Sequence, residues 1–179
     1  MTDRKLSESS FSHVVNVPID RVDLADWLFH ITSEEYQRCC PPAHIAAGAT
    51  TTDDGRPVSI NVEMIGESLM IQQYVGELVG PRHCRLVSLS AAFSARGRTT
   101  VEVMWHLKVD PIDERSCAYT NRVIVTATEE FLAFIAHQGI SFEQARTKRQ
   151  EAASAHNRIE TPLFAQSIER RALAQLVAA

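Results

Sequence analysis

Residues 83–127, which read HCRLVSLSAAFSARGRTTVEVMWHLKVDPIDERSCAYTNRVIVTA, carry the clearest sequence signal for the fold. Apolar and polar side chains alternate through most of this stretch with a period of two, which is typical of β-strands. Short turn segments at 95–97 and 110–114 divide it into three parts. Because connections this short place consecutive strands side by side in opposite directions, the stretch predicts three antiparallel strands.

The alternation extends toward the N-terminus and indicates further strands. Asp54 with Gly55 strongly favours a hairpin turn, and Gly80 with Pro81 ends another segment. A loose tail is expected at residues 1–9, followed by a strand from residue 10 that ends at Pro18, since proline cannot donate to a β-ladder. The six strands predicted after it are 43–52, 57–65, 69–78, 83–93, 99–109 and 115–127.

Capping residues mark the predicted helices. One helix is expected from Asp20, and Thr32 with Glu35 forms a capping box for a second, short helix. After the strands, Thr128 as N-cap and Gly139 as C-terminal end bound a helix to about residue 138. A capping box then opens a second helix over 141–160, and Pro162 favours the start of a last one. The sequence therefore predicts an α+β fold in the order strand, two helices, six strands and C-terminal helices.

Composition and charge limit the classes of function. The 179 residues, 45% hydrophobic and 22% charged, have the size and composition of one globular domain, residues 1–179. A net charge of −4 disfavours nucleic acid as a partner, and the basic cluster Arg146, Lys148 and Arg149 is interpreted as a solvated helix face.

The expected compartment is the cytoplasm. The N-terminus lacks the apolar core of a secretion signal, and no run approaches the roughly 18 apolar residues that span a bilayer, so no membrane insertion is expected. Reduced cysteines are the expected state there, and a homodimer is the default oligomer.

This order of elements resembles the START-like, or SRPBCC, superfamily of helix-grip proteins, which includes polyketide cyclases, plant pollen-allergen relatives and lipid-transfer domains. The resemblance covers residues 10–138 as the helix-grip core and leaves 139–179 as a C-terminal helical extension. It implies a seven-stranded curved antiparallel sheet that encloses, with the last helix, a pocket for lipids, aromatic polyketides or hormones. Either 128–138 or 141–160 is expected to fill the grip.

Strand alternation selects side chains expected to point into that pocket. In 99–109, Trp105 shares a face with the apolar residues and is expected to point inward, with plain core packing as the alternative to ligand contact. In 115–127, the more apolar face carries Tyr119 and Asn121. Their polar groups, once buried, need partners from the protein, from water or from a ligand.

The two strands before them give less decisive patterns. In 69–78, Gln73 is the better inward candidate and Tyr74 is ambiguous. In 57–65, Glu63 lies on the polar face and is expected at the surface, unless a β-bulge reverses it.

Two histidines are candidates for moving a proton, because imidazole titrates near neutral pH. His44 follows two prolines, where a helix passes to a strand near the expected mouth of the pocket, and no acid lies near it in sequence. His156 lies on or beside an apolar stripe that includes Ile159, and Glu160, four residues later, can contact it and raise its basicity. A structural role is the alternative for both histidines.

Searches for known motifs leave three hypotheses. The sequence has no phosphate-binding glycine loop, no HExxH, no GxSxG and no cupin-like pair of histidines, so we expect no metal and no nucleotide cofactor. The hypotheses are a carrier of a small apolar or aromatic molecule, a cyclase-type or aromatase-type enzyme in which His44, Tyr119 or His156 moves a proton, and an interaction protein without a ligand. The candidate ligand-binding residues are Gln73, Trp105, Tyr119, Asn121 and His44.

Overall fold

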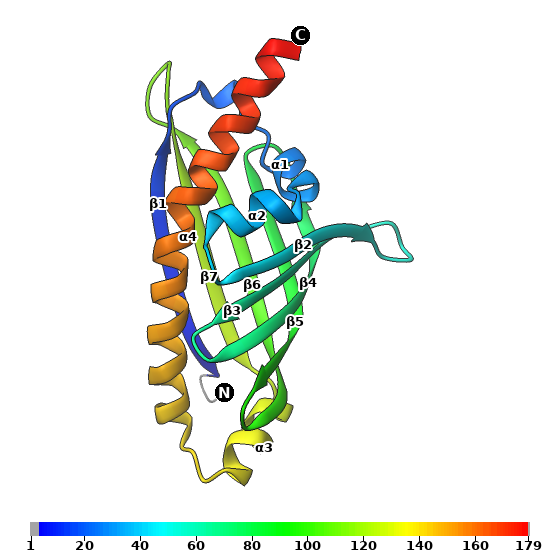
Figure 1. Cartoon of the computed structure of the whole chain (residues 1–179), viewed down its shortest axis with the longest axis vertical. Coiled ribbons are helices and arrows are strands. Elements are labelled where there is room, and N and C mark those ends of the chain that lie inside the picture. The colour runs from blue at the N-terminus through cyan, green and yellow to red at the C-terminus, as the bar shows by residue number, and fades with distance from the viewer. Residues whose placement is uncertain (1–3, 179) are drawn as a thin grey trace.

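A seven-stranded antiparallel sheet is the frame of the molecule in the computed structural model, which describes residues 4–178 and the side chains of 4–174. The strand order is β1-β7-β6-β5-β4-β3-β2, so consecutive strands from β2 to β7 are neighbours and β1 pairs with β7. The sheet curls around one concave side (Figure 1). Its strands are β1 (Lys5–Val15), β2 (His44–Thr51), β3 (Pro57–Ile65), β4 (Ser68–Val79), β5 (His83–Ser94), β6 (Gly97–Pro111) and β7 (Cys117–Ala127).

The helices lie in two parts of the chain. A 3₁₀ turn, η1 (Ile19–Arg21), and two short helices, α1 (Leu24–His30) and α2 (Ser33–Cys39), separate β1 from β2. After β7 come α3 (Glu129–His137), at the lower end of the sheet in Figure 1, and the long helix α4 (Phe142–Ala178). The predicted α+β fold and its order of elements are confirmed.

The first strand begins earlier than predicted. β1 starts at Lys5, inside the segment expected to be a loose tail. It pairs with β7 along its length, and Leu6 is completely buried in the core. The polar sequence hid this strand because small serine side chains, among them Ser7 and Ser9, occupy buried positions.

The first α-helix begins later than predicted. The helix expected from Asp20 starts at Leu24, because the side chain of Asp23 accepts a hydrogen bond from the backbone N–H of Asp26 (2.9 Å) and caps the helix there. The predicted capping box of the next helix is present at Thr32, whose hydroxyl accepts a hydrogen bond from the Glu35 N–H (3.2 Å).

The C-terminal region holds one helix of 37 residues where the sequence predicted a break at Pro162. Proline removes a backbone hydrogen bond from a helix interior, which costs stability. Here the next turn is held in place by packing, because Phe164 and Ile168 are only 1% and 2% exposed. Tertiary contacts therefore override the local preference.

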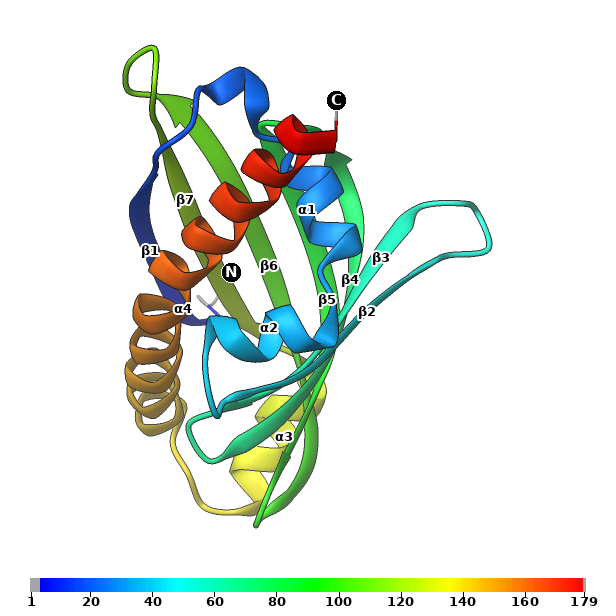
Figure 2. The same cartoon turned by 45° about the horizontal axis from the view of Figure 1, so that its top comes forward.

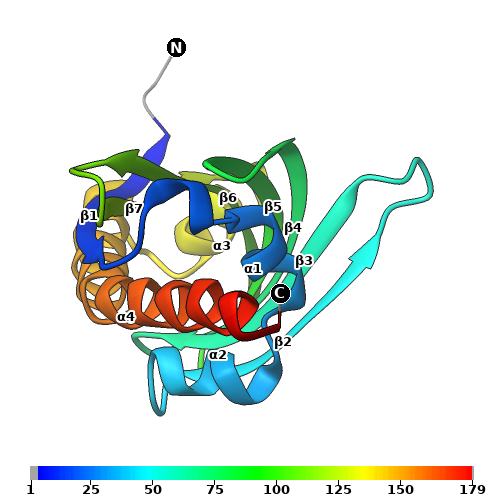
Figure 3. The same ribbon diagram turned by 90° about the horizontal axis from the view of Figure 1, so that it is seen from above.

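The two halves of α4 have different neighbours. The N-terminal half follows β1, where Gln150 both donates to and accepts from the backbone of Glu8. The C-terminal half crosses the open side of the curved sheet toward α1 and α2 (Figures 2 and 3). α4 is thus the gripping helix, and its grip continues past residue 160, the limit expected from the sequence.

Aromatic side chains join α4 to the rest of the core. The ring centroid of Phe164 lies 5.2 Å from that of Trp27, 6.1 Å from that of Trp105 and 6.2 Å from that of Tyr36. Trp27 Nε1 also donates to Ser167 Oγ (3.0 Å). These contacts fix the position of α4 over the concave face and so decide which of its residues reach the interior.

Candidate functional site

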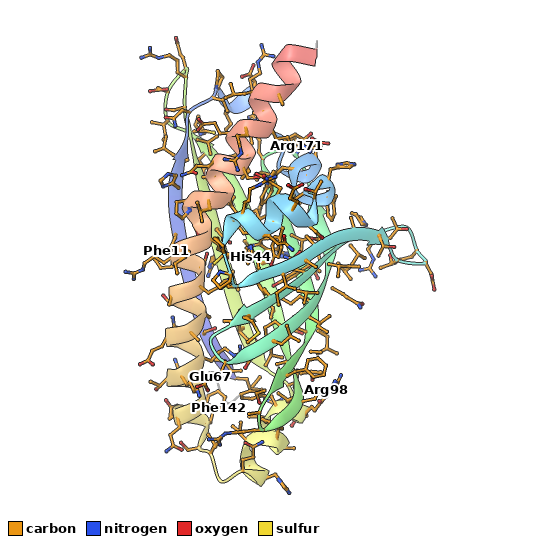
Figure 4. All side chains as sticks on the ribbon, in the orientation of Figure 1. Phe11, His44, Glu67, Arg98, Phe142 and Arg171 are labelled. Atoms are coloured by element: carbon orange, nitrogen blue, oxygen red, sulfur yellow. The ribbon has the colours of Figure 1, made fainter. Side chains whose placement is uncertain are left out.

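Four titratable side chains from three elements meet between the sheet and α4. His44 begins β2, and Glu63 lies opposite it in the β2–β3 register (His44 is labelled in Figure 4). His156 and Glu160 are one turn apart on α4. Their exposed fractions are 3%, 5%, 9% and 6% in chain order, so all four are shielded from bulk water. Charges in such a setting interact strongly.

The facing atoms of these four residues, which we call the His–Glu cluster, are in close contact. His156 Nε2 lies 2.9 Å from Glu63 Oε2 and 3.5 Å from Glu160 Oε2. His44 Nε2 lies 3.2 Å from Glu63 Oε2 and 3.1 Å from Glu160 Oε2. The two Nε2 atoms are 3.3 Å apart. A set of two imidazoles and two carboxylates at these distances can hold and move protons or coordinate a cation.

Tyr36 of α2 orients half of the cluster. His44 Nδ1 donates to the Tyr36 carbonyl (2.9 Å), which makes this nitrogen the N–H and turns Nε2 toward the carboxylates. The Tyr36 hydroxyl donates to Glu63 Oε2 (2.9 Å). The Tyr36 and His44 rings stack with centroids 3.8 Å apart. One residue therefore fixes a side chain from β2 and another from β3.

A chain of hydrogen bonds from β6 and β7 holds the other half. Trp105 Nε1 donates to Asn121 Oδ1 (2.7 Å), and Asn121 Nδ2 donates to Glu160 Oε1 (3.0 Å). The Trp105 N–H and the Asn121 amide thus find partners, as buried polar groups require, whereas the buried Tyr119 hydroxyl has none within residues 4–174. The hydrogen bond from Asn121 orients the Glu160 carboxylate so that its second oxygen faces the two histidines.

The cluster favours its charged forms. Burial opposes a positive charge on His44, but hydrogen bonds with Glu160 and Glu63 outweigh it and raise the pKa of His44 to about 9. For His156, burial is likewise outweighed by hydrogen bonds with Cys40, Glu160 and Glu63, so its pKa lies well above the ordinary value. Burial raises the pKa of each glutamate, yet both pKa values lie below the usual range because the two imidazoles hydrogen-bond to the carboxylates.

A narrow pocket adjoins the cluster. Its volume is about 30 Å³, which is room for about one water molecule. Its walls are mainly apolar and include the rings of Trp105 and Tyr74, whose centroids are 5.1 Å apart. The lining residues are Asn61, Glu63, Ile65, Met70, Gln72, Tyr74, Val103, Trp105, Val123, Val125, Arg149, Ala153, His156, Asn157 and Glu160.

Two polar groups in this pocket lack strong partners within residues 4–174. Arg149 Nη1 lies 3.8 Å from Met70 Sδ, which is a weak acceptor, and no carboxylate in that part of the chain pairs with the guanidinium. Burial lowers the pKa of Arg149. Gln72 donates through Nε2 to the Tyr74 hydroxyl (2.8 Å), but its buried Oε1 accepts no hydrogen bond. Both groups remain available to a molecule that enters the pocket.

The inward directions predicted for β6 and β7 are correct. Trp105, Tyr119 and Asn121 are 4%, 0% and 0% exposed. Trp105 lines the pocket and Asn121 positions Glu160, whereas Tyr119 lies outside the pocket lining, with its ring centroid 6.5 Å from that of Trp27. The roles of these residues as ligand contacts remain predictions.

The two candidate histidines come together, which the sequence did not anticipate. His44 is buried next to His156 instead of lying at a pocket mouth, and two carboxylates from distant parts of the chain contact it. The contact between His156 and Glu160 is the one that their spacing predicted. Whether either histidine moves a proton stays a prediction.

The inner face was predicted wrongly in β3 and β4. Glu63, expected at the surface, is 5% exposed, and Gln73, expected in the pocket, is exposed to solvent. Gln72 and Tyr74 point inward instead. Alternation shows which residues share a face, and hydrophobicity then assigns the more apolar face to the interior. Near the His–Glu cluster the interior is polar, so the polar face of each strand turns inward.

The inner face of α4 differs in the same way. Ile159, assigned to the apolar stripe, is 54% exposed. Arg149, interpreted as part of a solvated face, instead lines the pocket with Ala153, His156 and Glu160. Their spacings of four, three and four residues define one helix face. That spacing is present in the sequence, but Arg149 and Glu160 are charged, and hydrophobicity assigns charged residues to the surface.

No helix within residues 4–178 is both long and apolar enough to cross a membrane.

Comparisons with known proteins establish the architecture. A scan against protein-family models finds no match, and a search of curated proteins finds none either. Solved structures do match. The Zhui aromatase/cyclase from Streptomyces sp. R1128 is 13% identical with a TM-score of 0.63, and the match covers 94% of this chain and 94% of that one. A norcoclaurine synthase point mutant from Thalictrum flavum, in complex with a transition-state analogue, is 14% identical with a TM-score of 0.51, over 94% and 95%.

A two-domain protein gives a third match. The di-domain ARO/CYC StfQ from the steffimycin biosynthetic pathway is 16% identical with a TM-score of 0.57. The match covers 93% of this chain and 52% of that one, so this chain spans about half of the two-domain protein. At these identities the likeness concerns the fold alone. With its seven-stranded curved sheet closed by α4, this chain has the helix-grip fold seen in the aromatase/cyclase and norcoclaurine synthase structures.

Proposed function

We propose that the protein binds a small, largely apolar, aromatic molecule that carries an anionic group, in the pocket between the sheet and α4. The position of Arg149 carries the proposal: its guanidinium lines an apolar pocket and has no carboxylate partner within residues 4–174. Arg149 is half-buried, and even partial withdrawal of an unpaired cation from water costs free energy. An anionic group on a ligand would offset that cost, and a planar carboxylate fits a guanidinium well.

The pocket walls support the aromatic part of the proposal. Trp105 and Tyr74 present large flat surfaces, and aromatic rings prefer offset or edge-on contact with each other. The free Oε1 of Gln72 would accept a hydrogen bond from a hydroxyl of the same molecule. Solved structures of this fold include proteins named as an aromatase/cyclase and as a norcoclaurine synthase, which is consistent with a small-molecule pocket at this place.

The pocket has to open for such a ligand. Its volume of about 30 Å³ is far below the roughly 300–1,000 Å³ of common ligand pockets. The long, flexible side chains of Met70 and Arg149 contact each other in the pocket lining. We expect ligand entry to displace these two side chains first, so one-ring ligands should bind more readily than two-ring ligands.

The test uses matched anionic and neutral probes on protein kept in chelator. Benzoate is compared with benzamide and 2-naphthoate with 2-naphthamide, by calorimetry and by Trp fluorescence. We expect the anion of each pair to bind at least tenfold more tightly, and Arg149→Met to remove that preference without weakening the neutral probe. The matched control is Lys148→Met, which removes the exposed cation next to Arg149 in the sequence, one that pairs with Glu67. This variant should change the affinity for neither the anionic nor the neutral probes.

Mass spectrometry of molecules released from the freshly purified protein gives a second readout. A co-purifying aromatic acid would identify the natural ligand class. If no probe binds and no molecule co-purifies, the pocket is only a packing gap, and the interaction protein without a ligand becomes the better hypothesis.

Acid–base catalysis on the bound molecule is a second candidate function, favoured by the His–Glu cluster at the edge of the pocket. A suitable probe is 4-acetylbenzoate, which is anionic and carries an enolisable methyl ketone. If the protein is an enzyme, it should accelerate the exchange of the probe's methyl protons for deuterium. This acceleration should be lost in His156→Gln and kept in the exposed control His137→Gln. Binding without accelerated exchange would leave the carrier as the function.

A further inference from the structure

We infer that the His–Glu cluster is a binding site for one divalent transition-metal ion, with zinc as the reference ion. The ligand atoms would be His44 Nε2, Glu63 Oε2, His156 Nε2 and Glu160 Oε2. Imidazole nitrogens and carboxylate oxygens are donors that such ions prefer. The inference goes beyond the proposed function and does not rest on it, since four protein atoms bind the ion before any aromatic ligand is present.

The distances between the four atoms suit a single ion at their centre. Tetrahedral zinc has bonds of about 2.0–2.1 Å, which places neighbouring ligand atoms roughly 3.3 Å apart. The cluster contains separations of 2.9, 3.1, 3.2, 3.3 and 3.5 Å, and all four atoms lie within 4.8 Å of one another. Small side-chain movements would therefore complete the coordination shell.

The surrounding hydrogen bonds have the arrangement that metal sites use to orient their ligands. His44 donates through Nδ1 to the Tyr36 carbonyl (2.9 Å), which leaves the lone pair of Nε2 for a metal. The Tyr36 hydroxyl fixes Glu63, and the Asn121 amide fixes the oxygen of Glu160 that faces away from the cluster. Three of the four ligands are thus pre-positioned from outside the cluster.

The charges also balance. Two buried carboxylates and two neutral imidazoles carry a charge of −2, which one divalent cation cancels. Within residues 4–174, the cluster atoms contact no lysine or arginine that could take the place of that cation. In the absence of a metal the same balance needs a proton on each imidazole, so the site alternates between a proton-filled and a metal-filled form.

The pocket gives the ion a way in and leaves room beside it for one small molecule. Glu63, His156 and Glu160 line the pocket, whereas His44 lies behind them. An ion bound among the four atoms would therefore face the pocket space of about 30 Å³, enough for one water molecule or one oxygen of an anionic ligand. Because four protein atoms already fill a tetrahedral shell, such an oxygen would be a fifth ligand.

The experiment measures metal binding by the full chain without any aromatic probe. Protein stripped with chelator is checked for folding by circular dichroism and then titrated with zinc, with metal content read by elemental analysis. We expect one zinc per chain and, with cobalt, the visible absorption bands of a protein-bound ion. Glu63→Gln and Glu160→Gln should each weaken binding at least 100-fold, and Tyr36→Phe, which removes only the hydroxyl, about 10–100-fold.

Controls and a wild-type measurement keep the inference open to refutation. Glu67→Gln and His137→Gln alter an exposed carboxylate and an exposed imidazole and should stay within twofold of the wild type. If a cluster variant does not fold, X-ray absorption of the zinc-loaded wild type still decides: nitrogen and oxygen donors support the site. Sulfur at about 2.3 Å would show that Cys40 binds instead and overturn this donor set. Absence of stoichiometric binding, or full affinity in folded Glu160→Gln, would overturn the inference altogether. Because the aromatic probes are titrated in chelator, either proposal can fail without the other.

Discussion

Replacing Glu160 with glutamine tests the buried charges most directly, in protein kept free of metal by chelator. Glutamine preserves the size of the side chain and can still accept the hydrogen bond from Asn121 (3.0 Å). It removes the negative charge that lies 3.1 Å from His44 Nε2 and 3.5 Å from His156 Nε2. Two imidazoles are then left with the single carboxylate of Glu63.

Two estimates give the magnitude. Breaking a buried ion pair by removing one partner typically costs about 3–5 kcal/mol. The loss is limited because an imidazole can release its proton: with its pKa at about 9, His44 at pH 7 is held protonated by about two pKa units, or about 3 kcal/mol. We therefore expect Glu160→Gln to lower the free energy of unfolding by about 3 kcal/mol.

Urea denaturation at pH 7 measures this value, and a double-mutant cycle shows its origin. His44→Gln combined with Glu160→Gln removes one charge of each sign, so the double variant should lose at least ~1 kcal/mol less than the sum of the singles. Glu67→Gln, whose partner Lys148 is exposed, should cost less than about 0.5 kcal/mol. A cost below about 1 kcal/mol for Glu160→Gln, or additive single costs, would refute a charged His–Glu cluster.

Three further predictions concern packing, helix continuity and pH. Phe164→Ala should lower the free energy of unfolding by about 3–5 kcal/mol in urea denaturation, because it empties a site that is 1% exposed; a cost below about 1 kcal/mol would show that α4 does not close the sheet here. Pro162→Ala should raise stability by about 1–3 kcal/mol, since alanine restores the N–H that a helix interior uses, and a lowered melting temperature would mean that the packing requires proline. Burial raises the pKa of the Cys39 thiol from 9.0 to about 12. The contribution of the neutral thiol to the free energy of unfolding is therefore complete below pH 9 and is lost as pH rises toward 12. Compared with Cys39→Ala, the wild type should lose about 2 kcal/mol of this free energy by pH 10.5, and parallel pH profiles of the two proteins would contradict this.

Local signals in the sequence were sufficient for the architecture. The period-two alternation and short turns of 83–127 predicted β5, β6 and β7, and the capping residues Thr32 and Thr128 marked helices that begin where expected. These signals are strong because they depend on neighbouring residues only. Where tertiary contacts compete with them, prediction failed: serines hid the start of β1, and Pro162 wrongly implied a break in α4.

The candidate site shows the same division more sharply. The sequence alone determined that Trp105, Tyr119 and Asn121 point inward and that His156 can touch Glu160, because each follows from the geometry of a single strand or helix. The inward position of Glu63 and the contact between His44 and His156, which are 112 positions apart, depend on how the strands and α4 pack together. Hydrophobicity assigns polar residues to the surface, and an interior that pairs opposite charges reverses that assignment, so the fold had to bring β2, β3 and α4 together before the cluster could be recognised.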